Sequence, residues 1–178
     1  DNAIGAALAG QYLCDNLEAG SKVAILQGII TTTTGQARAE GSAEAVKECG
    51  LDLVMEVAAD FDRARGLAAT EDIVTQHPDL AGLFASNDEM ALGAVEALRA
   101  AGMLEQVTVV GYDANPDARE AVLAGEMAAT IAQNPINMGY FGVESLIKLI
   151  NGETLDPVID TGTVLVDESN AAEFASGE

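Results

Sequence analysis

The stretch HPDLAGLFASNDEMALGAVEALRAAG, residues 77–102, contains one complete strand-and-helix unit. Its apolar run Leu80–Ala85 is short and nearly continuous, which is typical of a parallel strand that is covered on both faces. Asn87 is a good N-cap for the Ala-rich helix Asp88–Ala101, and Gly102 is a good terminator for the same helix. The stretch therefore predicts a buried strand that leads directly into a helix.

The same alternation extends along the chain in both directions. Further strands are predicted at Lys22–Gln27, Asp52–Val57 and Val107–Gly111, and a weaker one at Ala128–Ala132. Helices with polar caps or an initial proline are predicted over residues 2–19, Gln36–Cys49, Arg63–Gln76, 116–124 and 135–151. Strands that alternate with helices predict an α/β fold with a doubly wound parallel sheet. Within this plan, the TTTT run at 31–34 is expected to be a polar loop, and Asn115 is expected to cap the helix at Pro116.

Composition and charge exclude several classes of protein. The 178 residues are 49% apolar, enough for one domain and an appendage at roughly 150 residues per domain. Eight Lys and Arg against 29 Asp and Glu give a net charge of −21, which repels nucleic acid and anionic membranes. No apolar run reaches the ~18 residues of a membrane span. The start Asp1-Asn2-Ala3-Ile4 lacks an initiator Met and a signal segment, as expected of a mature or truncated chain.

The sequence offers little for catalysis or metal binding. One His and two Cys argue against a zinc site, so we expect no metal and no cofactor. His77 precedes Pro78 at a predicted helix end and is expected to be structural. No Ser/His/Asp, Cys/His or paired-carboxylate arrangement has the spacing for catalysis, and no general base is poised near neutral pH. We therefore expect a protein that is not an enzyme.

Polar side chains follow the predicted strands, where ligands bind in open parallel sheets. The candidate binding residues are Arg38, Phe61, Asn87, Asp113 and Gln133. The forked polar groups suit vicinal hydroxyls, and the phenyl ring suits the C–H face of a sugar. A phosphate is disfavoured, because GIITTTTG lacks the Gly-Lys-Ser/Thr ending of a Walker loop. The set therefore predicts a small neutral polyol as ligand.

Four of these residues also have a purely structural alternative. Asn87 would serve only as a helix cap, and Asp113 would serve only to fix the turn that contains it. Arg38 would be a surface residue of its helix, and Phe61 would be part of the core. Their joint placement at one edge of the predicted sheet favours the functional interpretation.

Three runs carry a resemblance to a known family. They are ADFDRARGL (59–67), the stretch 77–102 quoted above, and VVGYDANPDAREAVLAGEMAATIAQNP (109–135). Together they resemble the ribose-binding branch of the periplasmic sugar-binding proteins, which are solute receptors of ABC importers. The resemblance implies a periplasmic or other extracytoplasmic receptor with a permease partner and a small neutral sugar, first of all ribose or a similar pentose. By motif, it places the sugar contacts on Arg38, Phe61, Asn87, Asp113 and Gln133.

The resemblance also implies a division of the chain. Members of that family bind the sugar between two lobes, and the first lobe would precede Asp1. Residues 1–133 would form the second lobe, residues 134–161 would belong to the first lobe, and residues 162–178 would be a return segment and polar tail. The chain would then carry half of the interlobe site. The effector-binding core of a LacI-type regulator shares the fold and is an alternative, as is a flavodoxin-like enzyme or response-regulator domain.

Two features outside the site leave alternatives open. Cys14 and Cys49 fall near the ends of two helices that flank the first strand, so they are either two buried free thiols or a disulfide. The helix 135–151 has a wide apolar face, which a lone hydrated helix does not retain. Either this helix folds back on its own lobe, or two chains form a homodimer through residues 135–166, where Pro157–Val166 is expected to be extended.

Overall fold

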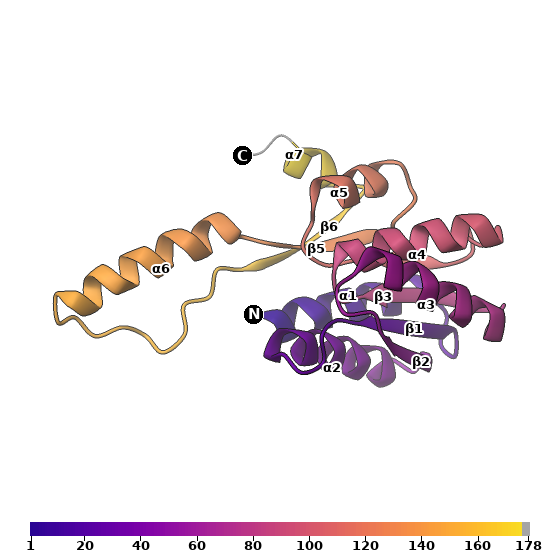
Figure 1. Ribbon diagram of the computed structural model, residues 1–178, viewed down its shortest axis with the longest axis horizontal. Coiled ribbons are helices and arrows are strands. Elements are labelled where there is room, and N and C mark those ends of the chain that lie inside the picture. The colour runs from indigo at the N-terminus through magenta and orange to yellow at the C-terminus, as the bar shows by residue number, and fades with distance from the viewer. Residues whose placement is uncertain (176–178) are drawn as a thin grey trace.

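The computed structural model describes residues 1–175 and contains one six-stranded sheet with helices on both faces (Figure 1). The strands lie in the order β2-β1-β3-β4-β5-β6, in which β1 to β5 are parallel and β6 is antiparallel to β5. They are β1 (Lys22–Gln27), β2 (Asp52–Ala58), β3 (Leu80–Ala85), β4 (Thr108–Val110), β5 (Ala129–Gln133) and β6 (Thr163–Asp167). The predicted α/β fold with a doubly wound sheet is confirmed.

The helices form two layers around this sheet, apart from the sixth, which extends away from it (Figure 1). They are α1 (Asn2–Asn16), α2 (Thr33–Glu48), α3 (Arg63–Gln76), α4 (Asp88–Ala101), α5 (Pro116–Leu123), α6 (Pro135–Ile150) and α7 (Ala171–Ala175). Alternate residues of β1 enter opposite cores: Val23 and Ile25 pack with α1 and α2, whereas Ala24 and Leu26 pack with α3 and α4. Burial on both faces explains why the four central residues of this strand, 23–26, are all apolar. Among the helices of residues 1–175, none has the length and apolar character that crossing a membrane requires.

Several predicted boundaries are wrong, each for a local reason. Helix α2 begins inside the TTTT run, because the Thr32 hydroxyl caps it by accepting a 3.0 Å bond from the Gly35 N–H. Helix α1 is capped by Asp1 and ends at Asn16, before the predicted end. Strand β4 begins after Val107, whose N–H donates to the Met103 carbonyl in a turn. The ends of β2 and β4 and both ends of β5 differ from prediction by one residue, whereas β1 and β3 agree with it.

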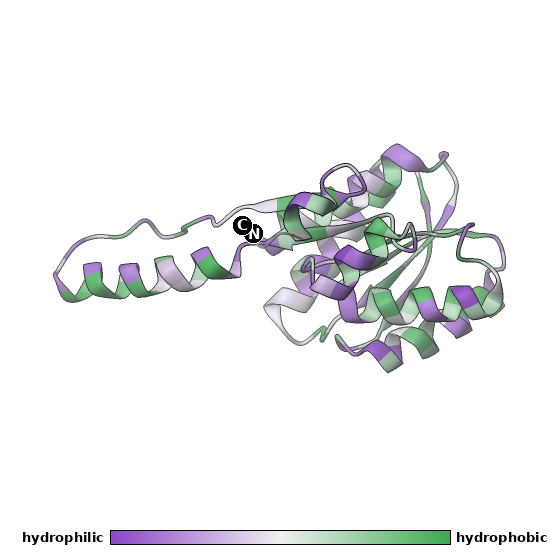
Figure 2. Cartoon of the chain, turned by 90° about the horizontal axis from the view of Figure 1, so that it is seen from above, coloured by the Kyte–Doolittle hydropathy of each residue, from purple (hydrophilic) through white to green (hydrophobic). Residues whose placement is uncertain are grey.

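Helix α6 and residues 151–162 form an arm that extends away from the lobe (Figures 1 and 2). No residue of α6 is buried, and Ile136 and Ile150 are 82% and 83% exposed. The structure therefore contradicts the fold-back of this helix onto its own lobe. The predicted extended segment Pro157–Val166 is also corrected, because strand structure begins only at Thr163. From there β6 returns to the lobe and pairs with β5, with Gln133 opposite Thr163.

Helices α1 and α2 lie side by side, and a disulfide joins Cys14 to Cys49 with their Cα atoms 6.0 Å apart. The two cysteines are 35 residues apart in the sequence. Of the two alternatives left open by the sequence, the structure contains the bridge. It ties the end of α1 to the residue that follows α2, so both helices are held against the same face of the sheet.

Removing this bridge should lower the free energy of unfolding by about 3–4 kcal/mol, because the unbridged unfolded chain gains the entropy of an open loop. Chemical denaturation of Cys14→Ala/Cys49→Ala beside the unaltered chain measures the difference. Thiol titration of the denatured, unreduced chain should detect no reactive thiol. Two reactive thiols per chain would contradict the bridge.

Candidate functional site

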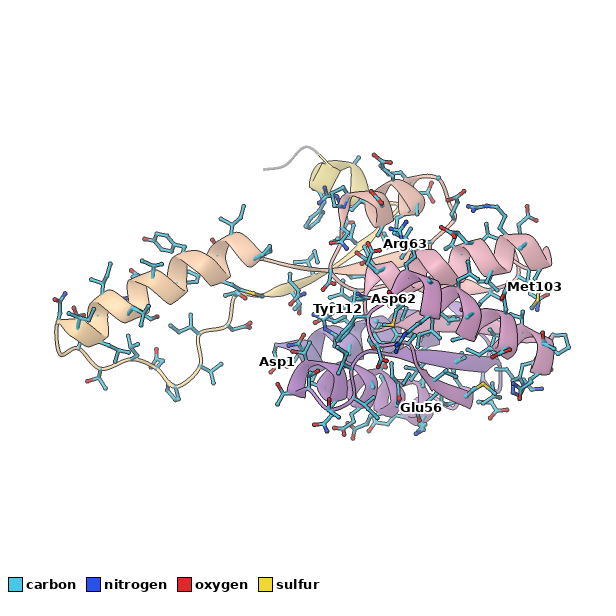
Figure 3. The ribbon with its side chains drawn as sticks, in the orientation of Figure 1. Asp1, Glu56, Asp62, Arg63, Met103 and Tyr112 are labelled. Carbon is cyan, nitrogen blue, oxygen red and sulfur yellow. A yellow bond between two sulfur atoms is a disulfide. The ribbon has the colours of Figure 1, made fainter. Side chains whose placement is uncertain are left out.

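All five candidate residues lie at or just beyond the carboxyl ends of the parallel strands. Arg38 projects from α2, Phe61 and Asn87 follow β2 and β3, and Asp113 and Gln133 lie beyond β4 and at the end of β5. Tyr112, next to Asp113, is labelled in Figure 3 on the side of the lobe from which the arm extends. The parallel connections of the sheet thus bring together loops that are far apart in the sequence.

The side chains of Arg38, Asp113 and Gln133 form one hydrogen-bonded group. The Asp113 Oδ1 atom accepts from Arg38 Nη1 at 3.0 Å and from Gln133 Nε2 at 2.6 Å. The Asp113 side chain remains 28% exposed, so its carboxylate is held firmly at a surface that solvent still reaches. The structure therefore brings together three of the five predicted residues by direct side-chain contact.

Arg38 is fixed by further contacts on its protein side. Its Nε donates to Asn2 Oδ1 at 2.8 Å, and its Nη1 also donates to the Ser86 carbonyl at 2.8 Å. Its guanidinium carbon lies 3.8 Å from the centre of the Tyr112 ring, a cation–π arrangement. Because Arg38 is only 6% exposed, the alternative of a surface helix residue is wrong. Its orientation is set before any ligand arrives.

Asn87 and Phe61 form the second part of the site. The Asn87 Oδ1 atom accepts from the Met90 N–H at 3.0 Å as the N-cap of α4, and its Nδ2 donates to the Phe61 carbonyl at 3.2 Å. Asn87 is therefore a structural cap, and it also fixes the backbone of the aromatic residue. The Phe61 ring is partly buried, and a Cβ at Gly28 would collide with it. The structural alternatives thus describe real contacts: Asn87 caps a helix, and Phe61 packs against the core.

Left-handed backbone occurs at both site loops. Asp60 and Phe61 have φ angles of 52° and 62°, and Asp113 and Ala114 have φ angles of 116° and 55°. Non-glycine residues in this region cost free energy, and such positions cluster at binding sites. Asp113 is therefore part of the shape of its turn, as its structural alternative stated. The same turn presents the Asp113 carboxylate at the site.

Burial governs the electrostatics of the site. Burial raises the pKa of the Asp113 carboxyl above its ordinary value, while the adjacent Arg38 guanidinium opposes that rise. Burial likewise raises the pKa of the Tyr112 phenol, so this ring stays neutral beneath Arg38 at ordinary pH. The site therefore presents a charge-paired but accessible carboxylate.

Two polar groups of this constellation remain available to a ligand. Within residues 1–175, Arg38 Nη2 and Asp113 Oδ2 have no hydrogen-bond partner, although the neighbouring atom of each is engaged. A donor and an acceptor side by side match two vicinal hydroxyls of a polyol.

A surface hollow of about 620 Å³ over α2, β1 and β2 lies elsewhere and is lined by none of the five candidates.

Sequence reasoning missed the residues that support the site. Asn2 and Tyr112 hold Arg38, and Asp88 and Thr130 hold the turn at 113–115. Asn115 is the N-cap residue of α5 before Pro116, as predicted, but its side chain makes no capping hydrogen bond. Its own N–H donates to Asp88 Oδ2 at 2.6 Å. The one available signal was position, because Asp88 and Tyr112 directly adjoin predicted site residues.

The mostly parallel six-stranded sheet with helices on both faces is the fold of the type I periplasmic binding proteins. Residues 1–154 match the family model described as the periplasmic binding protein domain. The chain belongs to this family.

Relatives and solved structures agree with this assignment. The ribose import binding protein of Escherichia coli is 44% identical over 153 residues, which are 86% of this chain and 51% of that protein. The D-ribose/D-allose-binding protein of Pseudomonas aeruginosa is 38% identical over 170 residues, 93% of this chain and 53% of that protein. The chain thus spans about half the length of the curated relatives it matches.

A crystal structure of an ABC transporter periplasmic solute binding protein from Actinobacillus succinogenes with bound D-allose superposes with a TM-score of 0.92. The two sequences are 34% identical, and the match covers 97% of this chain and 62% of that chain. A periplasmic ribose ABC transporter structure from Conexibacter woesei also gives a TM-score of 0.92, at 30% identity, over 100% of this chain and 61% of that chain. The fold is therefore shared along the whole length, the arm included.

Proposed function

We propose that this chain is the sugar-binding second lobe of a non-enzymatic receptor that delivers ribose or a similar pentose to an ABC importer. The observation that carries the proposal is the group of Arg38, Asp113 and Gln133, whose free donor and acceptor match vicinal hydroxyls. Phe61 lies within the same strand-end edge, 5.9 Å from the Arg38 guanidinium carbon, and supplies an apolar face for the sugar ring. Asn87 completes the set.

The division of the chain follows from the arm. Residues 1–133 form the sugar-binding lobe, and residues 134–161 belong to the other lobe of the receptor. Residues 162–178 are the return segment and polar tail, of which 176–178 lie outside the described residues. This division is supported by the absence of buried residues in α6 and by the return of β6 to the edge of the lobe's own sheet. A helix with so much exposed apolar surface needs a covering surface.

The relatives support the remaining parts of the proposal. The Escherichia coli relative is an import binding protein by name, and both solved structures are named as ABC transporter proteins, so they favour a transport role over the effector-binding core of a LacI-type regulator. They favour a transport role over an enzyme for the same reason. A permease partner and a periplasmic or other extracytoplasmic location belong with this role. The disulfide between Cys14 and Cys49 suits such a compartment, because disulfides persist where conditions are oxidising.

When residues 1–178 are the only chain in solution, the apolar side chains of the arm can be buried only against a second copy of the chain. We therefore propose a homodimer through residues 135–166 under those conditions. Five apolar side chains on one stripe of α6 contribute roughly 1.5–3 kcal/mol each when buried. They are Ile136, Tyr140, Val143, Ile147 and Ile150, all more than half exposed.

The proposal about the ligand predicts a neutral sugar rather than a phosphorylated one. Titration of the ¹⁵N-labelled chain with D-ribose should give a dissociation constant of about 1 mM or weaker, because water still reaches the open half-site. D-Ribose 5-phosphate should bind more weakly still, since the chain has a net charge of −21 and the site exposes a carboxylate. Tighter binding of the phosphate ester than of ribose would count against the proposed ligand class.

A further inference from the structure

Asp88 is a buried carboxylic acid directly beneath the site, and no sugar contact accounts for it. It is the first residue of α4 and is 0% exposed. Each of its two oxygens accepts a hydrogen bond: Oδ1 accepts from the Thr130 hydroxyl at 2.6 Å, and Oδ2 accepts from the Asn115 N–H at 2.6 Å. The Thr130 hydroxyl oxygen in turn accepts from the Ala114 N–H at 3.2 Å.

These bonds hold the turn that carries Asp113. The N–H groups of Ala114 and Asn115, the two residues after Asp113, both point into the Asp88–Thr130 pair. On the other side of Asp88, its own N–H donates to the Tyr112 carbonyl at 2.8 Å. The left-handed backbone at Asp113 and Ala114 costs free energy and needs such fixing. A Cβ at Gly111 would collide with Asp88 Oδ1, so the strand end and the carboxylate are fitted closely together.

We propose that Asp88 and Thr130 form a positioning pair that holds the 112–115 turn, and hence the Asp113 carboxylate, in the orientation that binds sugar hydroxyls. This inference rests on the proposed function of the site. The pair touches no ligand and acts through the backbone of Ala114 and Asn115. Neither residue carries a role in the sequence-based site.

The location of Asp88 is costly, which favours a positioning role over one in stability. Burial raises the pKa of the Asp88 carboxyl from its ordinary 3.8 to about 7. Because the pKa is higher in the folded chain, the folded state binds the proton more tightly than the unfolded state. Ionisation of Asp88 therefore opposes folding increasingly as the pH rises from about 3.8 toward 7. An apolar residue would avoid this cost but could not accept the Asn115 N–H.

The positioning role predicts a pH dependence with a definite sign. The ionised carboxylate accepts from both Thr130 and Asn115, whereas protonation makes one oxygen a donor and disrupts that arrangement. The turn should be better fixed at pH 8 than at pH 6. The charged and titratable groups around Asp88 are Asp113, Tyr112, Arg38 and Arg119. The pKa of Asp113 is also raised by burial, and Arg38 donates to the Asp113 carboxylate. Arg119 donates to the Ala114 carbonyl. Asp88→Asn keeps all four groups and removes the Asp88 titration, and it replaces one acceptor oxygen by an amide donor at every pH.

The test combines amide exchange with sugar affinity in the 1–178 chain. Thr130→Val removes the hydroxyl, Thr130→Ser restores it, and Thr70→Val is the control, because Thr70 is equally buried and its hydroxyl bonds only the Gly66 carbonyl in α3. In Thr130→Val, the amides of Ala114 and Asn115 should exchange at least about 10-fold faster than in Thr70→Val, and D-ribose should bind about 10-fold more weakly. Thr130→Ser should restore both readouts to within about twofold.

A second readout uses the unaltered chain and so does not depend on the folding of Thr130→Val. The amide shifts of Ala114 and Asn115 should titrate with a midpoint near pH 7, and this step should vanish in Asp88→Asn. Flat shifts in the unaltered chain, or exchange in Thr130→Val equal to that in Thr70→Val, would overturn the inference. If the chain does not bind D-ribose, the proposed function fails, while exchange and pH titration still decide whether Asp88 and Thr130 hold the turn.

Discussion

Replacing Asp113 by alanine in the two-lobed receptor should lower its affinity for D-ribose by at least about 100-fold. Asp113 is the common acceptor for Arg38 and Gln133, so its removal deletes a sugar contact and leaves Gln133 Nε2 without its partner, while Arg38 Nη1 keeps only the Ser86 carbonyl. A hydrogen bond to a charged group is worth about 1.5–3 kcal/mol when water is excluded, and the loss of the partner of Gln133 adds to this. In the proposed receptor, closure of the other lobe over the sugar would provide that exclusion.

Isothermal titration calorimetry of the two-lobed receptor measures this loss. Asp79→Ala is the matched control, because Asp79 also pairs with a cation, Lys22 at 2.8 Å, but lies at the start of β3 on the opposite edge of the sheet. The control should bind within about twofold of the unaltered receptor, since exposed ion pairs contribute little. Equal affinities of Asp113→Ala and Asp79→Ala would remove Asp113 from the site.

Replacing Ile147 by glutamate should convert the isolated 1–178 chain from dimer to monomer. Ile147 lies in the middle of the apolar stripe of α6 and is 55% exposed, so burial of a new carboxylate in the dimer contact would be costly. Light scattering after size exclusion at micromolar concentration should give twice the 18.3 kDa chain mass for the unaltered protein. The Ile147→Glu chain should give the single mass.

Leu123→Glu provides the control for this experiment. Leu123 belongs to α5 of the lobe and is 47% exposed, so this variant adds the same charge at a similarly exposed apolar position outside the arm. It should remain dimeric. A single mass for the unaltered chain would refute the dimer, and a single mass for Leu123→Glu but not Ile147→Glu would place the contact on the lobe instead.

Local sequence signals predicted the central elements of the fold correctly. The bounds of β1, β3, α3 and α4 agree with prediction, because each element has a strong boundary signal, such as Asn87 before α4 and Gly102 after it. Prediction failed where a long-range contact decides the outcome. Asn115 takes the N-cap position of α5 that its local sequence predicts, but nothing local predicts that its N–H donates to Asp88, 27 residues earlier.

The sequence predicted which residues belong to the candidate site and at which edge of the sheet they lie. It did not predict the contacts between their side chains. The rule for parallel sheets placed Arg38, Asp113 and Gln133 at one edge, and the structure joins them by hydrogen bonds. Their role in sugar binding stays a prediction. The supporting pair of Asp88 and Thr130 was not predictable, because the two residues are 42 positions apart. Nothing in the sequence around Thr130 indicates that its hydroxyl contacts Asp88.

We propose that the edge carrying Arg38, Asp113 and Gln133 binds a ribose-type sugar. Titration of the ¹⁵N-labelled chain with D-ribose is the sharpest check on this proposal, because each amide reports on its own position. We expect saturable shifts at Phe61, Asp113, Gln133 and the Arg38 side chain, with none at Asp79 or Lys22 on the opposite edge. Saturable shifts confined to the hollow over α2 and β2, or no shifts at tens of millimolar ribose, would contradict it.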